Sequence, residues 1–140
     1  MPHYKKPSLR DFGLPFEQDY KKFQRFLKAM CLRNNWALVN YSFNHFDVTA
    51  HIRDVWGNYV YLYRQYTGVG EAPKWRDTTW AFMIRNCTNS KDSGSDIHNI
   101  NVFVTQRTVE QEIKALFARK PKSRSKHLLF NWKRNRKINQ

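Results

Sequence analysis

The chain has 140 residues and a mass of 16.9 kDa, which is the length of one domain and excludes a multidomain architecture. Apolar residues make up 41% of the sequence and aromatic residues 16%, which excludes disorder throughout the chain and allows a hydrophobic core. The formal net charge of +14 favours a polyanionic partner such as nucleic acid.

The sequence offers no metal-binding motif and no membrane segment. Its two cysteines, Cys31 and Cys87, provide neither a zinc-ligand spacing nor a disulfide framework. No apolar run approaches the roughly 18 residues that a membrane span requires, and the first residues lack the apolar stretch of a secretory signal. We therefore expect no metal, cofactor or membrane partner, and a cytoplasmic location, in the host cytoplasm if the protein is viral or encoded by a mobile element.

The N-terminal residues 1–14 contain prolines and basic residues and are interpreted as a basic arm. A helix is predicted over residues 15–33, because its apolar positions recur with a period of 3.6 residues. Lys21, Arg25 and Lys28 lie together on another face of this helix. Such a stripe is either a solvated helix face or a phosphate-binding surface, and the sequence leaves both interpretations open.

Alternating apolar residues then predict five strands, starting near residues 36, 48, 59, 80 and 100. In the first strand the alternating set is Ala37, Val39, Tyr41 and Phe43. Gly57 and Asn58 predict a tight hairpin turn, since both residue types tolerate positive φ. Residues 86–96 have the composition of a polar loop.

A second helix is predicted from about Thr108 to residue 120, with a capping box formed by Thr108 and Gln111. The fold class is therefore α+β: an antiparallel meander of about five strands, with an N-terminal and a C-terminal helix on one face and a basic tail. The domain is expected to span residues 15–120, and the basic and aromatic tail is expected to span residues 121–140.

The predicted sheet has one face that suits nucleic acid. If Val48, Ile52 and Leu62 face the helices, alternation places His51, Arg53, Tyr59, Tyr61 and Tyr63 on the other face, with Arg85 as a neighbour. Tyrosine rings stack on unpaired bases, and arginines contact phosphates. Alternatively, the tyrosines reflect strand propensity and are half-buried by loops or by the tail.

The C-terminal segment, residues 119–140, contains nine Lys or Arg residues and no Asp or Glu. Charge runs are usually solvated, but Leu128, Leu129, Phe130 and Trp132 favour docking on the domain or ordering on a partner. In a eukaryotic host the KPKSRSK stretch would also suit nuclear localisation, although that motif has low specificity. The residues expected to contact nucleic acid are Lys21, Arg25, Lys28, Arg53, Tyr61, Tyr63, Arg85, Lys122, Arg124, Lys126, Trp132, Lys133, Arg134, Arg136 and Lys137.

Catalytic patterns are weak. The segment from His98 to Phe103 is similar to the His-hydrophobic-His motif of rolling-circle nucleases but lacks the second histidine that the metal needs. The signature of the RNA-recognition motif is missing. The element order resembles that of double-stranded-RNA-binding domains, but Glu110 and Glu112 stand where that fold carries lysines at the start of its last helix. We therefore expect no catalytic residues; a metal-dependent nuclease that uses His98 remains the last alternative.

Three hypotheses follow from the sequence. The first is a non-enzymatic protein that binds RNA or single-stranded DNA through basic and aromatic surfaces. The second is an inhibitor or accessory protein that binds a nucleic-acid enzyme or ribonucleoprotein; in overall character the chain is similar to small basic phage proteins of the anti-CRISPR kind, without a shared motif. The third is a structural protein of a ribonucleoprotein particle.

Overall fold

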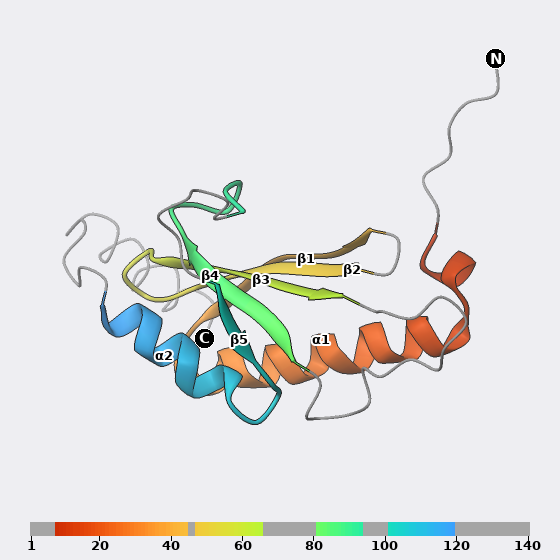
Figure 1. The fold of residues 1–140 in the computed structure, drawn as a ribbon, viewed down its shortest axis with the longest axis horizontal. Coiled ribbons are helices and arrows are strands. Elements are labelled where there is room, and N and C mark those ends of the chain that lie inside the picture. The colour runs from red at the N-terminus through yellow and green to blue at the C-terminus, as the bar shows by residue number, and fades with distance from the viewer. Residues whose placement is uncertain (1–7, 45–46, 66–80, 94–100, 120–140) are drawn as a thin grey trace, which may run out of the picture.

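The computed structural model describes residues 8–44, 47–65, 81–93 and 101–119, which form a sheet and two helices that cover one of its faces (Figure 1). The strands are β1 (Ala37–Asn44), β2 (Asp47–Arg53), β3 (Tyr59–Gln65), β4 (Phe82–Cys87) and β5 (Val102–Val104). Each strand pairs antiparallel with the next, in the order β1-β2-β3-β4-β5. The predicted α+β meander with a helix at each end is confirmed.

The two helices are α1 (Leu14–Asn34) and α2 (Val109–Ala118), close to the predicted ranges 15–33 and 108–120. α1 begins with a proline in its first turn, where no helical hydrogen bond is lost. It ends at Asn34, and the capping residue Asn35 has a left-handed φ of 58°. The amide of Trp36 then donates to the carbonyl of Cys31 at 2.9 Å, a bond typical of a closed helix end.

The described part of the predicted N-terminal arm is folded. Leu9–Phe12 form a 3₁₀ turn, η1, and the amide of Ser8 donates to Asp11 Oδ2 at 2.7 Å. Leu9 and Phe12 pack against the core, and the Phe12 ring lies 5.7 Å from that of Phe43. Apolar contacts of Leu9 and Phe12 thus hold this described part of the segment against the core.

The core lies between the sheet and the two helices, as the alternation predicted. The inward positions of β2 and β3 are buried together with one stripe of each helix. The principal members are Phe16, Phe23, Leu27 and Met30 of α1, Val48, Ala50 and Ile52 of β2, Val60 and Leu62 of β3, and Val109, Ile113, Leu116 and Phe117 of α2.

A β-bulge in β1 divides the alternating set predicted for that strand. The register shifts between Val39 and Ser42, and Asn40 has a φ of 57°. Val39 pairs with His51 on the outer face, whereas Phe43 pairs with Val48 on the core face. One extra residue in the strand therefore moves the side chains that follow it to the other face.

An arginine lies inside the core. Arg64 on β3 follows Val60 and Leu62 on the inward face and is completely buried. Its guanidinium carbon lies 4.3 Å from the ring centroid of Phe23 and 5.5 Å from that of Phe82. Burial lowers the pKa of Arg64 to about 10, while Tyr41 and the carboxylate of Asp19 act in the opposite direction. Cation–π contact and the nearby acid offset the loss of hydration.

Two predicted local motifs take a different form. The β2–β3 turn does contain Gly57 at positive φ, but the carboxylate of Asp54 closes it, accepting the amides of Trp56 and Asn58 at 2.9 and 2.8 Å. The predicted capping box of α2 is wrong. Thr108 makes no side-chain cap, because its hydroxyl accepts the Thr105 amide at 2.9 Å instead.

Candidate nucleic-acid interface

The predicted basic stripe lies on the solvent side of α1. Lys21, Arg25 and Lys28 are all exposed, while Phe23 and Leu27 between them turn into the core. A rise of 1.5 Å per residue spreads the three cations over about 10 Å. The stripe is therefore long enough to meet more than one phosphate of a nucleic-acid backbone.

Among the residues that the structure describes, little negative charge neutralises this stripe. Lys21 Nζ lies 3.0 Å from Glu17 Oε1, an exposed i,i+4 pair. Such pairs contribute only about 0.3–0.5 kcal/mol, so Lys21 can exchange this partner for another anion. Within the described ranges, Arg25 and Lys28 form no ion pair.

Four of the expected nucleic-acid contacts lie together on the outer face of the sheet, away from α1 and α2: Arg53, Tyr61, Tyr63 and Arg85. Across β2, β3 and β4, His51, Tyr61 and Arg85 form one row, and Tyr63 lies two residues along β3 from Tyr61. Arg53 pairs with Tyr59 on the same face. The structure therefore divides the described site residues between two opposite surfaces, the α1 stripe and the outer sheet face.

Tyr61 is enclosed by its neighbours. Its side chain is 9% exposed, the Arg85 guanidinium carbon lies 5.2 Å from its ring centroid, and the His51 ring lies 5.4 Å away. Burial raises the pKa of Tyr61, and the positive charge of Arg85 partly opposes that rise. Tyr61 packs with Met83 and Cys87 in a small second cluster. In this arrangement Tyr61 supports the outer face rather than presenting an open ring for stacking.

Residues 88–93 approach this face from the end of β4, on the side away from the helices (Figure 1). His51 Nε2 lies 2.8 Å from the carbonyl of Asp92, and Asn40 Nδ2 donates to the carbonyl of Ser90 at 2.8 Å. The Asp92 carboxylate accepts the amide of Thr88 at 2.9 Å and closes the turn. A polar loop was expected here. Its hydrogen bonds to β1 and β2 hold it over the outer face, where it covers part of His51.

Tyr63 is half-buried, and its hydroxyl donates to Asp47 Oδ2 at 2.8 Å. Burial, reinforced by this hydrogen bond and by the negative charge of Asp47, raises the pKa of Tyr63 to about 12. The phenol therefore stays neutral at physiological pH. Arg53 and Arg85 are likewise half-buried.

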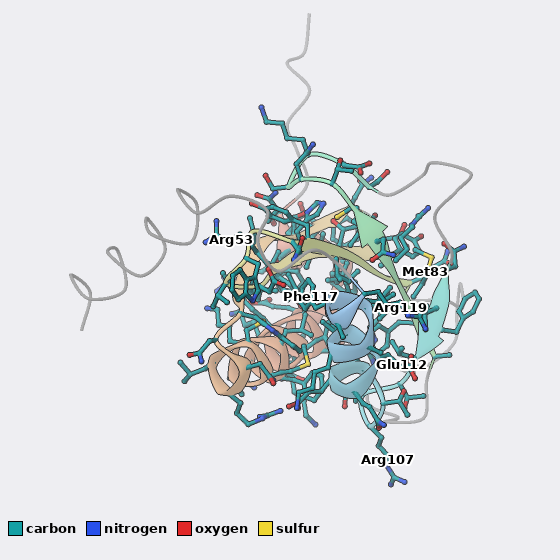
Figure 2. All side chains as sticks on the ribbon, turned by 90° about the vertical axis from the view of Figure 1, so that its left-hand side faces the viewer. Arg53, Met83, Arg107, Glu112, Phe117 and Arg119 are labelled. Atoms are coloured by element: carbon teal, nitrogen blue, oxygen red, sulfur yellow. The ribbon has the colours of Figure 1, made fainter. Side chains whose placement is uncertain are left out.

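An aromatic pocket was missed by the sequence interpretation. It lies where the end of α1, the β2–β3 turn and the end of α2 meet, and its aromatic side chains are Trp36, Trp56 and Phe117. These residues are far apart in the sequence, so no local pattern predicts the pocket. The only signal for it in the sequence is the large number of tryptophans. Figure 2 shows Phe117 near the end of α2, where that helix approaches the sheet.

The other predicted contacts lie outside the described residues. They are Lys122, Arg124, Lys126, Trp132, Lys133, Arg134, Arg136 and Lys137. His98, which carried the nuclease alternative, is also outside them. In the described part of the chain no three His, Cys, Asp or Glu side chains gather as a metal site, and no helix there is long and apolar enough to cross a membrane.

Comparison with known proteins gives no family assignment. The sequence matches no protein-family model, and neither a curated protein nor a solved structure is significantly similar to it. Functional inference therefore rests on the residues and geometry of this chain.

Proposed function

We propose that this protein binds single-stranded nucleic acid, either RNA or DNA, without catalysing a reaction on it. The observation that carries the proposal is the solvent face of α1, where Lys21, Arg25 and Lys28 are exposed and only Lys21 has an acidic partner among the described residues. When clustered cations without compensating acids bind a phosphate backbone, they displace the counterions condensed on the nucleic acid, and the release of these counterions drives association.

The distribution of charge along the chain supports the same proposal. All 11 acidic residues precede residue 119, so the nine basic residues of the C-terminal segment lack acidic neighbours in sequence. Aromatic residues accompany these charges, with Phe130 and Trp132 in the segment itself. Stacking on aromatic rings requires unpaired bases, which favours single strands over a duplex.

The α1 stripe can be tested by removing one charge. Arg25→Gln should weaken binding to a fluorescent single-stranded oligonucleotide and reduce the slope of log affinity against log salt by about 0.7, the value for one single-strand phosphate contact. Arg107→Gln is the matched control, because it removes the same charge from an exposed residue that projects away from the body of the protein (Figure 2). Equal effects of the two substitutions would contradict a role for the stripe beyond net charge.

A protein partner would give a different result. An inhibitor of a nucleic-acid enzyme would retain its partner from cell extract after nuclease treatment, whereas a nucleic-acid-binding protein would lose what it had captured through RNA or DNA. Retention of one protein in stoichiometric amount, together with no affinity for oligonucleotides, would overturn the proposal.

A further inference from the structure

The pocket at the junction of α1, α2 and the β2–β3 turn is small and largely aromatic. Its volume is about 240 Å³. An engineered cavity of about 150 Å³ accommodates one benzene ring, and sites for drug-sized ligands begin near 300 Å³, so this pocket suits one nucleobase. The lining residues are Asn34, Trp36, Asp54, Val55, Trp56, Lys114, Phe117 and Ala118.

The aromatic walls offer surface to a planar ligand. Trp36 and Trp56 are half-buried, so each indole retains solvent-exposed area. Phe117 is almost fully buried, and its ring lies edge-on to Trp36, with 5.4 Å between the centroids and 66° between the planes. Phe117 therefore holds the Trp36 ring from the core side.

Hydrogen bonds fix the backbone at the two tryptophans before any ligand arrives. The buried Asp54 accepts the Trp56 amide at 2.9 Å, and the amide of Trp36 bonds to the last turn of α1. Glu110 of α2 accepts hydrogen bonds from Arg33 at 2.6 Å and from Asn34 at 2.9 Å, which joins the two helices beside the pocket. A preformed site loses less conformational entropy on binding.

Positive charge at the rim favours a nucleotide over an uncharged ring. The exposed Lys114 lines the pocket, and its Nζ lies 3.7 Å from Glu110 Oε2, a weak surface pair. Arg119, also exposed, follows directly after the end of α2. An ammonium beside an aromatic slot matches the combination of flat base and phosphate.

We infer that this pocket takes one unpaired base of a bound single strand, with Trp36 and Trp56 contacting the base and Lys114 contacting an adjacent phosphate. This inference rests on the proposed function and adds a defined base-binding position to it. The occupant is a base of RNA or single-stranded DNA, since either provides the same ring and phosphate.

The test is the affinity of the full-length protein for a single-stranded oligonucleotide of about ten nucleotides, within the usual range of site sizes. Trp56→Ala should weaken binding by about tenfold, the usual scale of one stacked base, and leave the salt slope unchanged because no cation is removed. Trp56→Phe should retain most of the affinity. Phe103→Ala is the control, because Phe103 is a highly exposed aromatic residue on β5 that does not line the pocket.

Circular dichroism establishes whether Trp56→Ala folds, and the binding of wild-type protein to abasic oligonucleotides provides the test if it does not. With wild-type protein, replacing bases by abasic sites should weaken binding sharply at one position and slightly elsewhere. Unchanged affinity in a folded Trp56→Ala variant that still responds to Arg25→Gln would overturn the pocket while leaving the proposed function intact. Loss of affinity in Phe103→Ala equal to that in Trp56→Ala would also overturn it. No salt-dependent binding of any strand would refute the proposed function itself.

Discussion

Replacing Arg64 by Met should destabilise the domain by about 3 kcal/mol, because it removes a buried guanidinium that lies against Phe23 and is attracted by the carboxylate of Asp19. Asp19 is 4% exposed, and its charge favours the protonated state of Arg64. Removing one member of a buried charge pair usually costs about 3–5 kcal/mol. Met fills much of the same space between Phe23 and Phe82, so little packing energy is lost and the lower end of that range applies.

A double-mutant cycle separates the charge from the packing. Asp19→Asn combined with Arg64→Met removes both charges, and the double variant should be at least about 1 kcal/mol more stable than the sum of the single effects predicts. Arg64→Lys keeps the charge but loses the planar contact with Phe23, and it should fall between wild type and Arg64→Met. Urea unfolding at neutral pH, followed by circular dichroism, measures all five proteins: wild type, the two single variants and the double variant of the cycle, and Arg64→Lys.

Strictly additive effects would refute an electrostatic coupling between these two residues. An Arg64→Met variant as stable as wild type, with Asp19 intact, would refute a stabilising role for the buried guanidinium.

Three further predictions concern local features. Asn40→Ala should lower the free energy of unfolding by about 1–2 kcal/mol in urea, because alanine disfavours the left-handed φ and lacks the hydrogen bond to the Ser90 carbonyl. Asn40→Gly should lower it less, and equal losses in the two variants would contradict a backbone preference at this position. Burial raises the pKa of Cys31 from 9.0 to about 12, so the thiol ionises in the unfolded chain first, and the free energy of unfolding should fall as pH rises from 9 towards 12, by up to about 1.4 kcal/mol per pH unit. Cys31→Ala should lose less stability over this pH range, and a variant that loses as much as wild type would contradict the role of Cys31. Hydrogen bonds from Arg33 and Asn34 lower the pKa of Glu110 below 4.5, so its contribution to stability is complete above that pH and disappears as pH falls through the pKa of the folded state. Glu110→Gln should reduce the free energy of unfolding by under about 1 kcal/mol at pH 7 and leave it unchanged at pH 2, and an equal reduction at both pH values would refute the pairing with Arg33 and Asn34.

Much of the fold was predictable because its periodicities are regular. The 3.6-residue period of α1 and the alternation in β2 and β3 gave the correct elements and the correct inward residues. The same alternation assigns Arg64 to the core face beside Leu62, but a charged residue is not expected to be inside. The bulge at Asn40 was not predictable from alternation, because inserting one residue changes the face without changing the composition.

The candidate site was predictable in part. Exposure of Lys21, Arg25 and Lys28 follows from the helix period alone. The burial of Tyr61 does not follow from its strand, because it depends on Arg85 and His51 across the sheet. The aromatic pocket depends on three segments distant in sequence, and no local pattern records that they meet.

The most direct test of the account is the salt dependence of binding between full-length protein and a short single-stranded oligonucleotide. If only the three α1 cations contact phosphates, log affinity should fall against log salt with a slope of about −2, and contacts from the basic C-terminal segment would steepen it. Affinity should then decrease at least about tenfold between roughly 50 and 200 mM salt. An affinity that stays constant over this range would contradict the claim that the protein binds a nucleic-acid backbone through its basic residues.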